Sequence, residues 1–137
     1  MAGERRVPIA SDTDVVTARA EGRRLASELP FTSTDLTLIA TAISEMARNI
    51  IVYAGEGEIV VGVRREKGRD GLWVRAADEG PGIADVSRAL TDSYSTGMGL
   101  GLGLPGTRRI MDEFAISSAP GQGTVVEMTM WGGPRRG

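Results

Sequence analysis

The sequence predicts an α+β fold built as a two-layer sandwich, with helices packed on one face of a mixed, mostly antiparallel sheet. Apolar residues first recur at spacings of three and four over residues 11–54, which is typical of amphipathic helices. Alternation with a period of two follows over residues 59–76 and returns after residue 113, as in strands with one buried face. We therefore expect the order strand, two helices, two strands, loop, helix and two strands within one domain, residues 1–137.

The first expected elements are a short edge strand, "VPIA" at 7–10, and an amphipathic helix that begins after Ser11. Ser11 and Asp14 have the spacing of a capping box. Pro30 ends this helix. Small and apolar residues form its buried face, namely Val15, Ala18, Gly22, Leu25 and Leu29.

A second, longer helix is expected after Pro30. Its cap is Ser33 or Thr34, and Gly55 ends it, because glycine readily adopts the conformation required after a helix C-terminus. The apolar stripe of this helix consists of Leu36, Ile39, Ile43, Met46, Ile50 and Tyr53.

The remaining elements are mostly strands. One strand has apolar residues at 59, 61 and 63 and the next at 72, 74 and 76, with "KGRDG" as the turn between them. A short helix at 84–90 and a helix of about 104–113 are expected next. The turn "PGQG" joins two final strands, "FAISSA" and "GTVVEMTMW".

Composition excludes several classes of protein. The chain has a formal net charge of −2, no Cys and no His, so it can form no disulfide and no thiolate metal site, and it has no imidazole for catalysis. Its single lysine, Lys67, lies in a predicted turn, which excludes a Walker A loop and the strand lysine of eukaryotic-type kinases. Its arginine pairs are not interleaved with aromatic residues, and the apolar run "IIVYA" is too short to span a membrane. We expect a cytoplasmic protein that binds neither nucleic acid nor membrane.

Glu45 and Asn49 lie four residues apart in "SEMARNI", hence on one face of the second helix at the rim of its apolar stripe. A carboxylate in this position could accept a proton, and an amide oxygen is a hard ligand suited to Mg²⁺. A solvated helix flank is the alternative interpretation of this pair.

Asp78 continues the alternation of residues 72, 74 and 76 in the second expected strand of this hairpin, and it is therefore placed on the core side of the sheet. A buried carboxylate is costly unless it is paired or hydrogen-bonded. Gly80, Pro81 and Gly82 follow at once, turn the chain and clear space beside the carboxylate. These features suit a pocket floor that accepts a hydrogen bond from an exocyclic amine; a turn with a capping aspartate is the alternative.

The segment "TGMGLGLGLPGTRRIM", residues 96–111, has glycine at every second position from Gly97 to Gly103 and again at Gly106. Pro105 favours a helix start there, so the glycines open onto a helix N-terminus, where free amide groups suit a phosphate. The spacing does not fit a Rossmann fingerprint. A flexible linker is not expected, because the elements on both sides are needed to complete one small core.

Taken together, the order E-x-x-x-N, D-x-G-x-G, glycine-rich lid and G-x-G-T resembles the GHKL family of ATPases and kinases, which has the Bergerat fold. The four blocks are Glu45–Asn49, Asp78–Gly82, Gly97–Gly103 and Gly121–Thr124. The segments "TAISEMARNIIVYAGEGEI", "DEGPGI" and "STGMGLGLGLPGTRRIMDEF" are similar to those of the RsbT-type switch serine/threonine kinases of stressosomes. The resemblance spans roughly residues 7–131, the expected core of the domain.

The resemblance implies a site for ATP and Mg²⁺. In this family the residue matching Glu45 is the general base, and that matching Asn49 coordinates Mg²⁺. The residue matching Asp78 binds the adenine amine, often through a water shared with that matching Thr124. The other expected nucleotide-binding residues are Gly80, Gly82, Ile83, Thr96, Gly97, Gly99, Gly101, Leu102, Gly103 and Leu104.

The resemblance also implies partners. An RsbT-like kinase phosphorylates serine or threonine on STAS-domain proteins (RsbS-like and RsbR-like) and, once released, activates a PP2C-type phosphatase (RsbU-like) in a stress response that controls a sigma factor. An RsbW-like anti-sigma factor, which sequesters a sigma factor and is also a kinase, is the alternative. A detached histidine-kinase module is less consistent with a chain that has no histidine. The resemblance leaves open whether the chain forms a homodimer.

Overall fold

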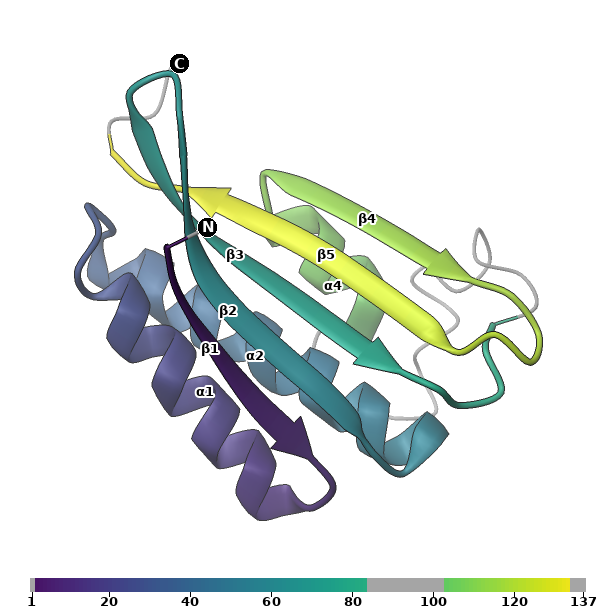
Figure 1. Ribbon diagram of the computed structural model, residues 1–137. Coiled ribbons are helices and arrows are strands. Elements are labelled where there is room, and N and C mark those ends of the chain that lie inside the picture. Colours follow the sequence, from purple (N-terminus) through teal and green to yellow (C-terminus); the bar gives the residue numbers. More distant parts are fainter. Residues whose placement is uncertain (1, 84–102, 134–137) are drawn as a thin grey trace.

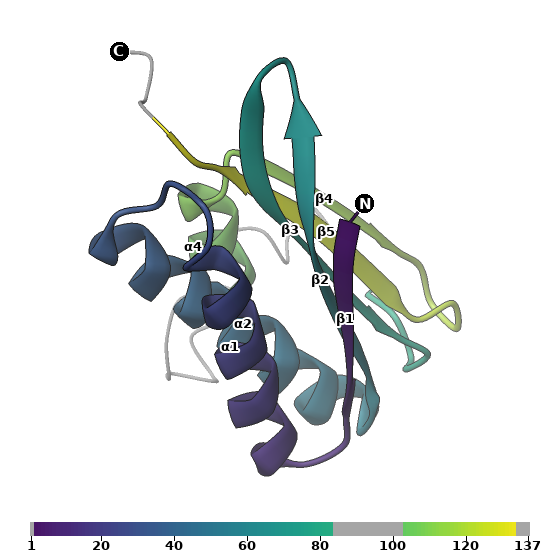
Figure 2. The same cartoon turned by 60° about the vertical axis from the view of Figure 1, so that its left-hand side comes forward.

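The computed structural model describes residues 2–83 and 103–133. The helices cover one face of a five-stranded sheet and leave the other face open (Figure 1; Figure 2). The elements are β1 (Ala2–Ile9), α1 (Asp12–Ala26), α2 (Ser33–Ala54), β2 (Gly57–Glu66), β3 (Arg69–Asp78), α4 (Gly103–Ile110), β4 (Glu113–Ser118) and β5 (Thr124–Trp131). The predicted α+β sandwich is confirmed, whereas the short helix expected at 84–90 lies outside the described residues.

Both long helices begin at capping boxes. At α1 the backbone N–H of Ser11 donates to Asp14 Oδ2 at 3.1 Å, as predicted. The cap of α2 is Thr32 rather than Ser33 or Thr34, and here the prediction was wrong. Thr32 alone among the three has a carboxylate three residues later: its Oγ1 accepts from the N–H of Asp35 at 3.1 Å, and its own N–H donates to Asp35 Oδ2 at 3.1 Å.

The sheet has the strand order β1-β2-β3-β5-β4, and every described pairing is antiparallel. The sequence predicted a mixed sheet, and this was wrong for the described strands. β3 and β4 run parallel, but β5 lies between them and pairs antiparallel with both, so the two parallel strands do not pair. β1 begins at Ala2, well before the predicted 7–10, because it pairs with β2 as far as Val63. α4 ends at Ile110, earlier than predicted, because Glu113 already pairs with Thr129 in the sheet.

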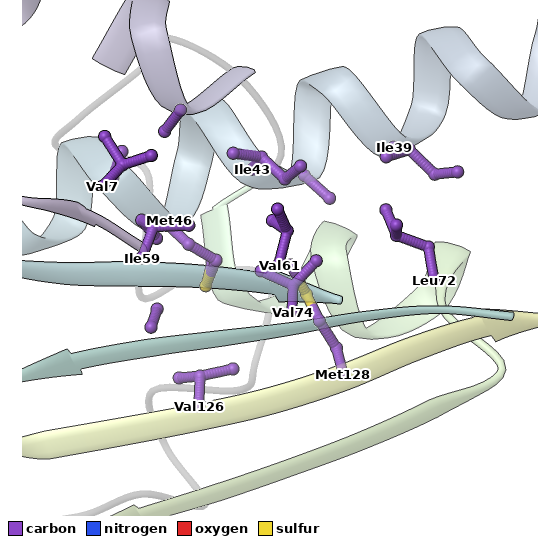
Figure 3. Packing of buried hydrophobic residues seen from close by; sticks show 14 of the residues in the cluster. Val7, Ile39, Ile43, Met46, Ile59, Val61, Leu72, Val74, Val126 and Met128 are labelled. Atoms are coloured by element: carbon purple, nitrogen blue, oxygen red, sulfur yellow. The ribbon is translucent and has the colours of Figure 1, made fainter. Parts of the chain in front are cut away.

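The core lies between α2 and the helix-facing side of the sheet (Figure 3). Ile39 and Ile43 are fully buried and Met46 is 1% exposed. Their partners are the alternating residues of the strands, including Ile59, Val61, Leu72, Val74, Val126 and Met128. Among the described helices α2 is long and apolar enough to cross a membrane by length and composition, yet its apolar stripe packs against the sheet as that of a core helix does.

Tyr53 does not continue the buried stripe, contrary to the prediction. Its side chain is 48% exposed. In this last turn Ala54 faces the loop after β3 instead, since a Cβ placed on Gly80 would lie 2.6 Å from the Ala54 Cβ. The close approach of this loop to the end of α2 therefore replaces the packing that a large side chain would supply.

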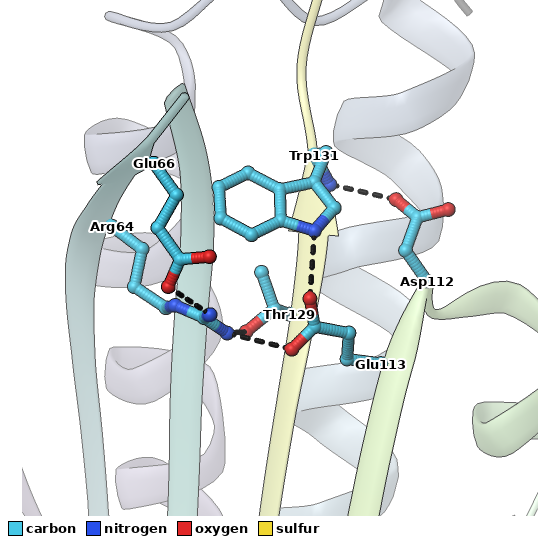
Figure 4. Close-up of polar contacts among 6 residues, drawn as sticks. All are labelled: Arg64, Glu66, Asp112, Glu113, Thr129 and Trp131. Atoms are coloured by element: carbon cyan, nitrogen blue, oxygen red, sulfur yellow. Dashed lines mark hydrogen bonds and ion pairs between the residues drawn. The ribbon is translucent and has the colours of Figure 1, made fainter. Parts of the chain in front are cut away.

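A polar cluster anchors the end of β5 that lies away from Asp78 (Figure 4). The Trp131 indole N–H donates to Glu113 Oε2 at 3.0 Å, and the Trp131 backbone N–H donates to Asp112 Oδ2 at 2.7 Å. Arg64 donates to Glu113 at 2.9 Å and to Thr129 at 2.8 Å, and it also pairs with Glu66. The guanidinium groups of Arg64 and Arg69 lie 4.8 and 4.2 Å from the Trp131 ring centroid, within cation–π range.

This cluster makes stability depend on pH. Hydrogen bonds from Arg64 and Trp131 hold the pKa of Glu113 below its ordinary 4.5. A carboxyl whose pKa is lowered by folding stabilises the fold above its unfolded pKa, and this contribution is lost as pH falls through the lowered value. We expect Glu113→Gln to lower the free energy of unfolding in urea at pH 7, and the difference from wild type to narrow by pH 3.5. The exposed Glu127 provides the control Glu127→Gln. An equal loss for Glu113→Gln at both pH values would contradict this account.

Candidate functional site

Three polar side chains form one row across the end of the sheet. Asp78 of β3 pairs with Thr124 of β5, and Thr124 pairs with Ser118 of β4. Directly opposed residues of antiparallel strands share a face. Asp78 shares its face with the buried Val74 and Ala76, so this row lies on the helix-facing side. The predicted core-side position of Asp78 is confirmed.

Hydrogen bonds fix each member of the row. Asp78 Oδ1 accepts from the N–H of Gly80 at 2.9 Å, which also satisfies the alternative interpretation of Asp78 as a turn cap. Ser118 Oγ accepts from the N–H of Ile83, donates to the carbonyl of Gly123 and contacts Thr124 Oγ1, each at 2.8 Å. The loop after β3, the turn before β5 and the end of β4 are thus held together at Ser118.

Ser118 was not predicted, although the sequence carries a signal for it. Phe114 and Ile116 alternate with exposed residues in β4 and pack against the core. The same period of two places Ser118 on their face, just as it placed Asp78 on the face of Val74. A hydroxyl at the core-facing end of a strand requires a partner.

Two glycines near the row are required by backbone packing. Gly82 has φ +79°, and a Cβ there would lie 2.0 Å from the carbonyl oxygen of Ala119. Gly123 has φ +72°, and a Cβ there would lie 2.2 Å from the carbonyl oxygen of Asp78. Gly82 was predicted to clear space beside the carboxylate; it also lets the loop approach the turn between β4 and β5.

Glu45 lies on α2 beside the buried stripe and is 8% exposed, while Asn49, one turn later, is half-buried. Glu45 Oε1 accepts from the backbone N–H of Gly103, the first residue of α4, at 3.3 Å. Its Oε2 lies 3.4 Å from Arg48 Nη1. Glu45 is therefore a buried, oriented carboxylate at a helix N-terminus, and the alternative of a solvated flank does not hold for it.

The predicted site residues lie beside the second half of α2. Glu45 and Asn49 precede Ala54, which contacts the Asp78 end through Gly80. Ala54 lies nine positions after Glu45, about 14 Å along the helix axis at the usual helical rise. Asp78 itself lies beside this stretch of the helix, because a Cβ on Gly57 would lie 2.8 Å from Ile50 Cγ2 and 3.1 Å from Asp78 Cβ.

The glycine-rich segment is described only at its end. Gly103 has φ +62° and begins α4, and Leu104 is 8% exposed within the hydrophobic core. A helix start near Pro105 was predicted and is confirmed within two residues. The other predicted binding residues of this segment lie outside the described residues, namely Thr96, Gly97, Gly99, Gly101 and Leu102.

Comparison with known proteins agrees with this geometry. Residues 34–132 match the family model of histidine kinase-, DNA gyrase B- and HSP90-like ATPases. The chain belongs to this family. The predicted GHKL membership is thereby confirmed, and the chain is an ATP-binding domain of this family.

Two curated relatives are similar to this chain over most of its length. The chain is 46% identical over 125 residues to the serine/threonine-protein kinase RsbT of Bacillus subtilis, covering 91% of this chain and 94% of that protein. It is 32% identical over 123 residues to the anti-sigma F factor of Caldanaerobacter subterraneus subsp. tengcongensis, covering 87% and 86%. The first likeness agrees with the predicted kinase activity, and the second with the predicted alternative.

A solved structure shares this GHKL fold. The crystal structure of the SiaB–SiaC complex from Pseudomonas aeruginosa matches 95% of this chain and 89% of its own, with a TM-score of 0.57. The sequence identity is 17%, so this likeness concerns the fold alone.

The donor set at the Glu45 end fits Mg²⁺ that is bound together with phosphate. Across residues 2–83 and 103–133, no three His, Cys, Asp or Glu side chains gather to hold a metal ion. Asn49 offers one amide oxygen, and Mg²⁺ commonly takes few protein ligands and completes its shell with phosphate oxygens and water.

The backbone approach at Gly123 can be tested against a matched glycine. Gly121 also has a positive φ, +76°, but open space where a Cβ would lie. Gly121→Ala should lower the free energy of unfolding by about 1–2 kcal/mol through the left-handed backbone alone. Gly123→Ala should cost about 1–3 kcal/mol more, because its Cβ overlaps the backbone of β3. Urea unfolding measures the free energy of each variant. Equal losses in the two variants would show that the backbone at Gly123 moves away from β3 without cost.

Proposed function

We propose that this chain is an ATP- and Mg²⁺-dependent serine/threonine-protein kinase of a partner-switching stress response. The observation that carries the proposal is the buried carboxylate of Glu45, held by the N–H of Gly103 one turn before Asn49 in a GHKL ATP-binding domain. The likeness to RsbT over 91% of the chain supports the protein-kinase reaction.

The nucleotide is proposed to bind with its base at the Asp78 row and its phosphates near Asn49. Asp78 accepts a hydrogen bond from the adenine amine, and Thr124 binds beside it. Gly80, Gly82 and Ile83 border the base, while the segment from Thr96 to Leu104 encloses the phosphates. The support is the shared face of Asp78 and Thr124.

Glu45 is proposed as the general base. It takes the proton of the attacking serine or threonine hydroxyl as that oxygen bonds to the γ-phosphorus. The bond to the bridging oxygen breaks and ADP leaves with the electron pair. Phosphoryl transfer depends mainly on positioning and charge stabilisation, and a carboxylate fixed by a backbone amide meets the first need. Mg²⁺ on Asn49 supplies charge neutralisation of the phosphates.

The proposed protein partners are STAS-domain proteins as substrates and a PP2C-type phosphatase as the released kinase's target, in the cytoplasm. The second candidate is an anti-sigma factor with kinase activity, favoured by the anti-sigma F relatives at about 30% identity. A pull-down from the source genome's own proteins separates them. Retention of STAS proteins supports the first candidate, and retention of a sigma factor supports the second.

The base end of the site is tested by Asp78→Asn. The variant should weaken Mg²⁺-ATP binding by about 1.5–3 kcal/mol, because a hydrogen bond to a charged acceptor is lost. Titration calorimetry measures this. Asp70→Asn is the control, since Asp70 lies at the far end of the same strand and pairs with Arg65. Unchanged ATP affinity in Asp78→Asn would remove Asp78 from the base pocket.

The chemical role of Glu45 is tested by Glu45→Gln, which keeps an acceptor for the Gly103 N–H. ATP affinity should stay within about tenfold, whereas phosphate transfer to a STAS protein should fall by roughly 10²–10⁴. Asn49→Ala should instead lose Mg²⁺-dependent ATP binding together with transfer. Labelled ATP and single-turnover assays measure transfer. Full transfer by Glu45→Gln would leave Glu45 as a structural residue that holds α4.

A further inference from the structure

Ser118 has three hydrogen-bonding neighbours and a single proton. It lies at 2.8 Å from the Ile83 N–H, from the Gly123 carbonyl oxygen and from Thr124 Oγ1. The amide can only donate and the carbonyl can only accept. The Ser118 proton therefore belongs to the bond with Gly123, and Ser118 Oγ is left as an acceptor toward Thr124.

The direction of the Ser118–Thr124 hydrogen bond follows from this. Thr124 must donate its one hydroxyl proton to Ser118, since that assignment alone satisfies all three contacts. Thr124 Oγ1 then has only lone pairs to offer any other group. Asp78, directly opposite Thr124 on the same face, is a carboxylate and also accepts. The row thus presents acceptors alone to a ligand.

We propose that Ser118 is a positioning residue that sets the base selectivity of the nucleotide site by holding the Thr124 hydroxyl as an acceptor. Adenine offers an amino donor at N6, whereas guanine has an acceptor oxygen at the equivalent position. A floor of acceptors binds the adenine amino group and repels an oxygen placed at the same position, so selectivity includes a repulsive element. Without Ser118, the Thr124 hydroxyl rotates freely and donates to the guanine oxygen.

This inference rests on the proposed placement of the base at Asp78. It goes further by assigning a specificity role to Ser118, which would contact no part of the nucleotide. A side chain that only braced the loop would affect all nucleotides alike. The ratio of GTP to ATP dissociation constants separates the two roles, because loosening of the loop cancels in it.

The experiment compares Ser118→Val with Ser118→Thr in the full chain. These side chains have nearly the same shape and differ in the hydroxyl. Dissociation constants for Mg²⁺-ATP and Mg²⁺-GTP are measured by calorimetry. Ser118→Val should lower the preference for ATP over GTP by about tenfold, because a repulsion between Thr124 and the guanine oxygen is replaced by one hydrogen bond. Ser118→Thr should keep the wild-type preference within about threefold. If Ser118→Val does not fold, Ser118→Ala removes the hydroxyl without added volume.

A double-mutant cycle tests whether Ser118 acts through Thr124. In the Thr124→Val background there is no hydroxyl to orient, so Ser118→Val should leave the ATP preference unchanged. If the single variant Ser118→Val keeps the wild-type preference while its affinities for ATP and GTP fall equally, the proposal is overturned. If Asp78→Asn weakens ATP binding while Ser118→Val keeps the wild-type ratio of GTP to ATP dissociation constants, the role of Ser118 fails and the placement of the base stands. If Asp78→Asn binds ATP normally, the placement of the base fails.

Discussion

The packing of α2 against the sheet is the constraint on which the rest of this structure depends. Ile39, Ile43 and Met46 are buried against the alternating residues of β2 and β3, and burial of such side chains is the largest favourable term in folding. The same helix carries Glu45 beside that stripe and ends against Gly80. Burying the stripe therefore also sets the distance between the two ends of the site. The core and the site share one helix, and neither can shift alone.

The strand β5 connects the site to the opposite end of the sheet. Thr124 begins this strand within the polar row, and Trp131 ends it within the cluster of Asp112, Glu113 and Arg64. A slip of one residue between β4 and β5 would turn every side chain to the other face. Because Glu113 bonds to both Trp131 and Arg64, it fixes the register that places a hydroxyl opposite Thr124. The polar cluster thus supports the site from a distance.

Local features were the most predictable part of the fold. The alternating strands, the capping box at Ser11 and the end of α2 at Gly55 follow from short-range rules and are confirmed. The errors lie where distant segments decide. In the last turn of α2 Ala54, rather than Tyr53, packs against the loop after β3, and β1 begins early because β2 offers a partner. The cap at Thr32 is the exception: the rule was local, and the position of Asp35 should have selected it.

The sequence by itself determined the family, the helix that carries Glu45 and Asn49, and the face of the sheet that carries Asp78. These follow from the order of the motifs and from periods of 3.6 and two, which any segment expresses through its own backbone. Only the tertiary structure brought Gly103 to Glu45 and the end of β4 to Thr124. The direction of a hydroxyl's hydrogen bond depends on which groups other segments place around it. No periodicity encodes that choice, because it is made by packing between residues far apart in the chain.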